Sequence, residues 1–212
     1  MGESMRGRWE ERLATAEAGL HPEGMSDKPP RREATYEDLE SVPSNLVGEI
    51  VGGELYVSPR PRLVHARATG QLFRALGPFD GDSGVEGPGG WVLVFEPELH
   101  LGGEALVPDL AGWRRERLPE LPDSAAMTLA PDWVCEVLSP STETLDRVRK
   151  MGSYAREGVR HLWLVHPGAR MLEVYRLESG QWLRLGAHTG DLTVHAEPFE
   201  AQPLKLGALW AR

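Results

Sequence analysis

Hydrophobic and polar positions follow two periods along the chain, and the changes of period mark the elements that we predict. In "LVGEIVGGELYVSP" (46–59) the apolar residues form two short strand patterns on either side of Gly52-Gly53, a pair typical of a hairpin turn. In "LVHARATGQLFRAL" (63–76) they recur at helical spacing, and a Gly-Pro pair ends the pattern. The sequence therefore predicts a hairpin followed by a helix.

The second part of the chain predicts strands around one more helix. Strand patterns cover 91–101, 105–113, 133–139 and three segments between 159 and 187. A helical pattern occupies 143–157, with Gly158 just past its end. Because one strand leads into a helix and then into another strand, the pattern indicates a mixed α/β (α+β) fold.

One strand, "WVCEVLS" (133–139), carries a carboxylate at Glu136 among apolar residues. In a strand Glu136 shares one side with Val134 and Leu138, while the neighbouring residues face the other side. A carboxylate buried without a partner is costly, so such a group is usually neutral, paired or bound to a metal. The residues alone leave two interpretations open: an ion pair with a basic side chain, or a metal ligand.

The net charge of the chain limits how it could bind nucleic acid. The formal net charge is −9, which repels nucleic acid at long range, so any phosphate-binding site has to be local. Of the 23 basic residues only Lys28, Lys150 and Lys205 are lysines. A lysine can act as a point donor or, when its pKa is lowered, as a base, which arginine cannot readily do. Cys135 is the only cysteine, which excludes an internal disulfide.

The ends of the chain show no targeting or membrane signal. The first 33 residues have a weak helical pattern and end in "SDKPPRRE", so we expect a helical or poorly ordered extension before a single domain over 34–212. Met25 could be the natural start, a hypothesis that N-terminal sequencing would test. No stretch approaches the roughly 18 apolar residues of a membrane span, and no signal peptide begins the chain. We therefore expect a cytoplasmic protein without a membrane partner.

The acidic residues suggest a metal site. Asp109 and Glu136 lie on strands predicted to be adjacent, where their oxygens could converge on Mg²⁺. Lys150 lies 14 residues beyond Glu136 on a helix that returns across the sheet, where its ammonium could orient a metal-bound water or take its proton. The alternative for Lys150 is a surface lysine paired with Asp146, one turn away.

At these residues the chain resembles a known family. "VPDLAGW", "PDWVCEVLSPST" and "DRVRKMGSYAREGVRHLWLVHP", preceded by "GEIVGGELYVSP" and a helix containing His65, are similar to the Uma2 family, formerly DUF820, of the PD-(D/E)XK superfamily. The match runs from about residue 35 to about 206. The resemblance implies a restriction-endonuclease-like core, a mostly antiparallel central sheet flanked by helices.

The resemblance also implies a site. Asp109 matches the aspartate of the family's "PD" and Glu136 the second acidic position, but Leu138 stands where the superfamily pattern expects lysine. Lys150, on the next helix, matches the position from which such families supply that lysine. Asp109, Glu136 and the main-chain carbonyl of Val137 would then hold Mg²⁺ or Mn²⁺, while Lys150 positions the attacking water.

Further roles are implied less directly. Glu49 or Glu54 would complete the metal shell through water, Tyr154 would pack against the site, and His65 would lie near its mouth. The implied activity is endonucleolytic hydrolysis of phosphodiester bonds, with nucleic acid as the partner, DNA ahead of RNA. A homodimer would let two sites cut both strands of a duplex.

Two other classes of function stay open from the sequence. The chain could keep the fold without catalysis and act as a dimeric binding or structural module, using its C-terminal strands and an exposed Trp182 or Trp210; the acidic net charge favours this modestly. A glycoside hydrolase with paired carboxylates needs a sugar cleft, and the sequence offers no sign of one.

Overall fold

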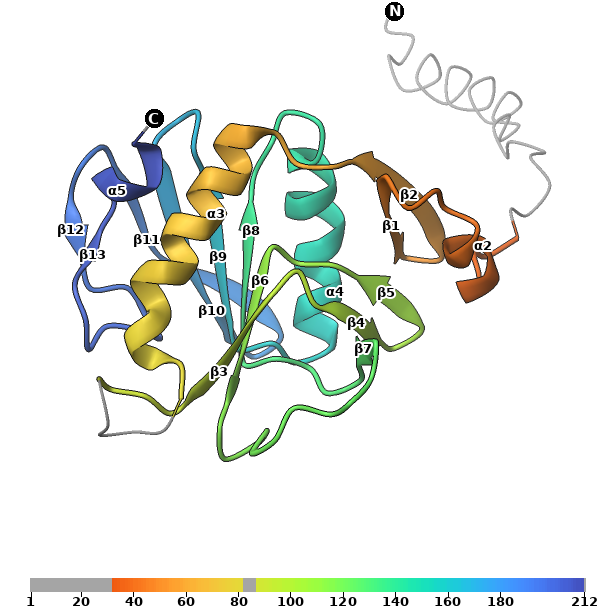
Figure 1. Cartoon of the computed structure of the whole chain (residues 1–212), viewed down its shortest axis with the longest axis horizontal. Helices are drawn as coiled ribbons and strands as arrows, with labels where there is room; N and C mark the ends of the chain where they lie inside the picture. The colour runs from red at the N-terminus through yellow and green to blue at the C-terminus, as the bar shows by residue number, and fades with distance from the viewer. Residues whose placement is uncertain (1–31, 82–86, 212) are drawn as a thin grey trace, which may run out of the picture. The chain divides into compact units, whose positions relative to one another are not determined.

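The computed structural model describes residues 32–81 and 87–211 (Figure 1). The extension predicted over residues 1–33 falls outside the described residues as far as residue 31, and so stays a prediction, as does the hypothesis about Met25. The elements below belong to one compact unit, Glu33–Arg212. No helix in the described ranges is long and apolar enough to cross a membrane.

The chain alternates short helices and strands, and the strands form three sheets. The elements in order are α2 (Tyr36–Glu40), β1 (Leu46–Val51), β2 (Glu54–Pro59), α3 (Leu63–Leu76), η1 (Gly77–Phe79), β3 (Trp91–Phe95), β4 (Glu98–Leu101), β5 (Glu104–Leu106), β6 (Leu110–Arg114), β7 (Ala126–Met127), β8 (Trp133–Val137), η2 (Leu145–Lys150), α4 (Met151–Arg156), β9 (His161–His166), β10 (Met171–Glu178), β11 (Gln181–Thr189), β12 (Thr193–Val194), β13 (Leu204–Lys205) and α5 (Gly207–Trp210). The central sheet has the order β11-β10-β9-β8-β6-β3, in which only β8 and β9 run parallel. A second sheet has the order β2-β1-β5-β4-β7, and β12 pairs with β13.

The predicted hairpin and first helix are confirmed. β1 and β2 pair antiparallel, with Val51 opposite Glu54. The two residues between them, Gly52 and Gly53, have φ angles of 59° and 75°, which glycine adopts without strain. The helix α3 begins and ends where the apolar spacing predicted it.

The strands predicted over 91–101 and 105–113 are each divided in two, which corrects the sequence prediction. β3 and β6 belong to the central sheet, whereas β4 and β5 belong to the second sheet. The first break falls at Glu96 and Pro97, where Glu96 has a φ of 45°. The second falls before β6, where Pro108 has no N–H to donate to a ladder. Asp109 therefore lies in the bend that leads into β6 rather than within a strand.

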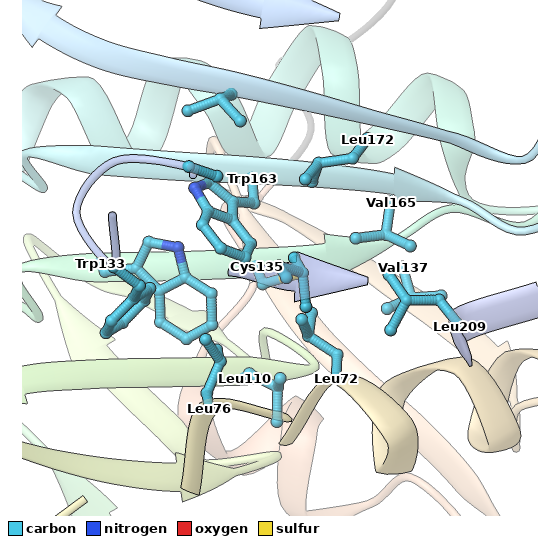
Figure 2. Packing of buried hydrophobic residues seen from close by; sticks show 14 of the residues in the cluster. Leu72, Leu76, Leu110, Trp133, Cys135, Val137, Trp163, Val165, Leu172 and Leu209 are labelled. Carbon is cyan, nitrogen blue, oxygen red and sulfur yellow. The ribbon is translucent and has the colours of Figure 1, made fainter. Parts of the chain in front are cut away.

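The central sheet has a packed layer on each face. On one face Leu72 and Leu76 of α3 pack with Trp133, Cys135 and Val137 of β8, as Figure 2 shows. On the other face Val134 and Leu138 pack with Tyr154 of α4 and with apolar residues of the second sheet. The alternation predicted for "WVCEVLS" is confirmed, and it turns Glu136 toward the layer formed by η2, α4 and the second sheet.

The helix predicted over 143–157 is present but contains a π-helical segment. The chain is helical from Glu143, forms the π-helix η2 over Leu145–Lys150, and continues as α4. Residues four apart lie close to one face of a helix. Asp146 and Lys150 share such a face, and both are buried.

Candidate active site

A small pocket lies where the C-terminal end of β8 meets β1, η2 and the start of α3. Its volume is about 70 Å³, enough for one or two waters or a small ion. The polar side chains that line it come from segments far apart in the sequence: Glu49, Ser58, His65, Glu96, Asp109, Glu136, Thr142, Asp146 and Lys150. The three residues that the sequence analysis placed first, Asp109, Glu136 and Lys150, are all among them.

Asp109 is held beside Glu136 by the sheet. β6 and β8 pair antiparallel with Leu110 opposite Cys135, so the residue before Leu110 comes next to the residue after Cys135. The Val137 N–H donates to Asp109 Oδ2 at 2.7 Å, which fixes the carboxylate against the end of β8. The predicted neighbourhood of the two carboxylates is thus seen in the structure.

Lys150 lies between carboxylates. Its Nζ is 2.8 Å from Glu49 Oε1, 2.8 Å from Glu136 Oε1 and 3.7 Å from Asp146 Oδ1, and it donates to the Val107 carbonyl at 3.3 Å. The lysine is 2% exposed. The alternative of a surface lysine paired only with Asp146 is therefore wrong, because Lys150 is buried and bridges residues of β1, β8 and η2.

The charge of Lys150 is set by its partners. Burial by itself lowers the pKa of a lysine, but Glu136 and Glu49 outweigh it and raise the pKa of Lys150 well above its usual value. Burial also raises the pKa of Glu136 well above its usual value, and Lys150 offsets this only in part. Because the ammonium contacts two carboxylates at 2.8 Å, we assign the lysine as the cation. Lys150 therefore keeps its proton and acts as a positively charged hydrogen-bond donor, not as a base.

Tyr154 contacts the site directly. Its hydroxyl donates to Glu136 Oε1 at 2.6 Å, and both side chains are buried. Burial, and next the negative charge of Glu136, raise the pKa of Tyr154 well above its usual value, so the hydroxyl keeps its proton. From the sequence we expected Tyr154 to pack against the site, and in the structure its hydroxyl also donates to Glu136.

Replacing Tyr154 with phenylalanine should destabilise the protein. The ring fits the same space, but Glu136 Oε1 loses a buried donor and keeps only Lys150. We expect the free energy of unfolding to fall by about 1–3 kcal/mol, measured by urea denaturation. Tyr175→Phe, which removes a hydroxyl bonded to Glu173 outside the pocket, is the matched control. Equal stability of Tyr154→Phe and the wild type would contradict the contact.

Asp146 is a member of the pocket that the sequence analysis named only as a surface partner of Lys150. It is buried, and burial raises its pKa from 3.8 to about 6, with Lys150 acting in the opposite direction. Helical spacing predicted the position of Asp146 beside Lys150, but not its burial, which depends on tertiary packing.

The pKa of Asp146 makes stability depend on pH. Between about pH 4 and pH 6 the folded protein holds a proton on Asp146 that the unfolded chain has released, so the free energy of unfolding falls as pH rises through this range. The difference between the wild type and Asp146→Asn should therefore fall by on the order of 1–3 kcal/mol from pH 4 to pH 6 and then stay level. Urea denaturation of both proteins across this range measures the difference. A constant difference would show that the Asp146 pKa is not raised.

His65 is one of the residues that line the pocket. Its Nε2 is 3.2 Å from Asp109 Oδ1, and its Nδ1 is buried without a partner among the described residues. Burial lowers the pKa of His65, but hydrogen bonding to Asp109 and its negative charge outweigh this and raise it.

The other residues proposed from the sequence divide between the pocket and the surface. Glu49 lines the pocket; besides contacting Lys150, its Oε1 accepts from the Val107 N–H at 2.8 Å. Glu54 lies on the exposed start of β2, where it accepts from the Tyr56 hydroxyl at 2.8 Å, and it is not among the pocket residues. Glu96 also lines the pocket, although it was not predicted to do so. It lies in a bend where its φ angle is positive.

The donor set fits a hard divalent cation. Asp109 and Glu136 offer carboxylate oxygens, and the Val137 carbonyl lies at the same end of β8. Within the described ranges no group of three or more His, Cys, Asp or Glu is arranged to hold a metal. Mg²⁺ commonly takes only one or two carboxylates and completes its octahedron with water and substrate phosphate, so two carboxylates beside a small pocket suit it.

Comparisons with known proteins give one family. The family model described as "Uma2: Putative restriction endonuclease" matches residues 34–206. A solved structure from Anabaena variabilis ATCC 29413, described as a "putative nuclease belonging to DUF820", superposes with a TM-score of 0.62 at 19% sequence identity, covering 84% of this chain and 97% of that chain. A search of the curated proteins found no match. The predicted restriction-endonuclease-like fold is confirmed, and because the family model covers most of its length, the chain belongs to the Uma2 family.

Proposed function

We propose that the protein is a Mg²⁺- or Mn²⁺-dependent endonuclease that hydrolyses phosphodiester bonds of nucleic acid, with DNA as the first candidate substrate. The observation that carries the proposal is the meeting of Asp109, Glu136 and Lys150 in one pocket, with the Lys150 ammonium 2.8 Å from Glu136. Membership of a family described as nucleases supports it.

The roles follow from the contacts. Asp109, Glu136 and the Val137 carbonyl would hold the metal. When bound, the metal would act as a Lewis acid on the phosphate and lower the pKa of a bound water. Lys150 provides a fixed positive charge at the edge of the pocket and a donor that can orient water or a phosphate oxygen. Glu49, Asp146 and Tyr154 hold Lys150 and Glu136 in place.

The fixed arrangement has a catalytic advantage. Lys150 is held by two carboxylates and a carbonyl, so its ammonium needs no reorganisation when negative charge develops on the phosphate. A binding module needs no such buried lysine, whose burial has to be offset by several partners. We also propose that the protein is cytoplasmic and forms a homodimer, which would present two sites to a duplex. Sedimentation of the purified protein would test the dimer.

The direct test is cleavage by the purified full-length chain. Supercoiled plasmid, linear duplex, single-stranded DNA and RNA are each incubated with Mg²⁺, with Mn²⁺ or with EDTA, and the products are separated on gels. Metal-dependent cleavage of at least one substrate is expected. If no substrate is cut with either metal, the protein is a nuclease-fold binding or structural module instead.

A further inference from the structure

A second, larger cavity lies across α3 from the candidate active site. It has a volume of about 700 Å³ and is formed by the first half of α3, the turn between β9 and β10, and α5, which lies beside α3 in Figure 1. Leu63, Val64 and Arg67 line this cavity, whereas His65 of the same helix lines the active-site pocket. One helix therefore separates the two, a width of about 10–12 Å with side chains.

The charged residues that line the cavity are all basic. They are Arg67 and Arg170, and no acidic residue lines it. Arg170 is paired with Asp191, while Arg67 is exposed and makes no ion pair within the described part of the chain. Because Asp191 offsets the charge of Arg170, it is Arg67 that supplies a positive charge suited to an anion, in a protein whose net charge is −9.

The rest of the lining is mostly apolar, and its residues on α3 are exposed. Leu63 is 88% exposed and Val64 59% exposed, in the first turn of α3. The prediction of an exposed Trp182 or Trp210 is wrong, because both are half-buried. The Trp210 indole N–H donates to the Gly190 carbonyl at 2.7 Å. This bond fixes the ring at the cavity wall. A fixed aromatic ring beside exposed aliphatic side chains and a free arginine is the combination that binds a nucleobase and its phosphate.

We propose that this cavity binds an unpaired nucleotide of the substrate strand, with the base against Trp210, Leu63 and Val64 and the phosphate on Arg67. The proposal rests on the nuclease function proposed above and specifies its substrate: nucleic acid that is single-stranded, or locally unpaired, near the cleaved bond. The cavity volume lies within the range of pockets for ligands of this size. At the spacing of about 3.4 Å of a strand stacked as in a duplex, the width of α3 corresponds to about three nucleotides, so cavity and active site can engage one strand.

The test separates binding from cleavage. Fluorescence anisotropy with labelled oligonucleotides of about 20 nucleotides, longer than a typical single-strand site, measures affinity in EDTA, where no cleavage occurs. The probes are a single strand, a blunt duplex and a duplex with an unpaired gap. Arg67→Glu and Leu63→Glu change exposed side chains, so folding should be kept. Arg160→Glu, an exposed arginine at the start of β9, is the matched control for charge reversal.

We expect the wild type to prefer the single strand and the gapped duplex over the blunt duplex. Arg67→Glu and Leu63→Glu should each weaken single-strand binding about tenfold or more, while Arg160→Glu changes it less than twofold.

Equal affinity of both variants and the wild type, equal losses on all three probes, or no binding by the wild type would overturn the proposal. The proposal would also be overturned if the cavity is occupied by a second copy of the chain. In that case Leu63→Glu would turn a dimer into a monomer without changing the affinity for the oligonucleotides. Metal-dependent cleavage that persists in Arg67→Glu with unchanged affinity would leave the nuclease function standing while removing this inference.

Discussion

Replacing Lys150 with methionine is expected to lower metal-dependent cleavage by about 10²–10⁴-fold, the range seen when one electrostatic or proton-transferring group is removed. Methionine keeps most of the length of the side chain, so the pocket keeps its shape while the ammonium is lost. Initial cleavage rates at saturating Mg²⁺ measure the effect on whichever substrate the wild type cuts.

The same substitution should also destabilise the protein, in a way that depends on pH. Lys150 is the cation 2.8 Å from both Glu49 and Glu136, and its removal leaves two buried carboxylates without a counter-charge. Breaking a buried ion pair from one side costs about 3–5 kcal/mol. Because a buried carboxylate can take up a proton instead, the loss should be smallest in acid. The stability deficit of Lys150→Met should thus grow as pH rises from about 5 to about 8.

Lys205 offers the matched control. It is another of the three lysines and is exposed on β13. Lys205→Met should change the free energy of unfolding by less than about 0.5 kcal/mol and leave cleavage unchanged. If Lys150→Met cleaved as fast as Lys205→Met, the enzymatic role of the buried lysine would be refuted, whatever the stability of the variant.

The central part of the fold could be predicted because its signals are local. The period-two pattern around Glu136 predicted which side of β8 each residue faces. Glycines marked the turn of the hairpin and the end of each predicted helix. The division of 91–101 and 105–113 between two sheets could not be predicted, because pairing partners are set by tertiary packing. Pro97 and Pro108 were the only local marks of the breaks.

The candidate site, like the fold, could be predicted from the sequence only in part. Asp109, Glu136 and Lys150 could be named because their residue types and order match a family pattern, and the structure brings them together. Asp146 and Glu96 lacked such a signal. Helical spacing placed Asp146 beside Lys150 but did not predict its burial, and Glu96 reaches the pocket through a bend with a positive φ angle. Glu49 and Glu54 looked equivalent in sequence, but Glu49 is buried in the pocket beside Lys150, whereas Glu54 is exposed at the start of β2.

Metal binding can be tested separately from cleavage with Asp109→Asn. The asparagine side-chain oxygen can still accept from the Val137 N–H, which Asp109 Oδ2 does at 2.7 Å, so the end of β8 should keep its position. The negative charge that a divalent cation needs is lost. We expect the wild type to bind Mn²⁺ in a calorimetric titration and Asp109→Asn to bind it at least about tenfold more weakly.

The control for Asp109→Asn is a second buried aspartate that also accepts a main-chain hydrogen bond. Asp132 accepts from the Arg114 N–H at 2.9 Å and from Arg117 at 2.8 Å, and it does not line the pocket. Asp132→Asn should therefore lose stability through its ion pair yet bind Mn²⁺ like the wild type. Loss of binding in both variants would indicate damage to the sheet, and loss in neither would remove Asp109 as a ligand. Only loss confined to Asp109→Asn supports a metal held at the end of β8, because the two substitutions remove the same charge from similar main-chain contacts and differ in whether the carboxylate faces Glu136.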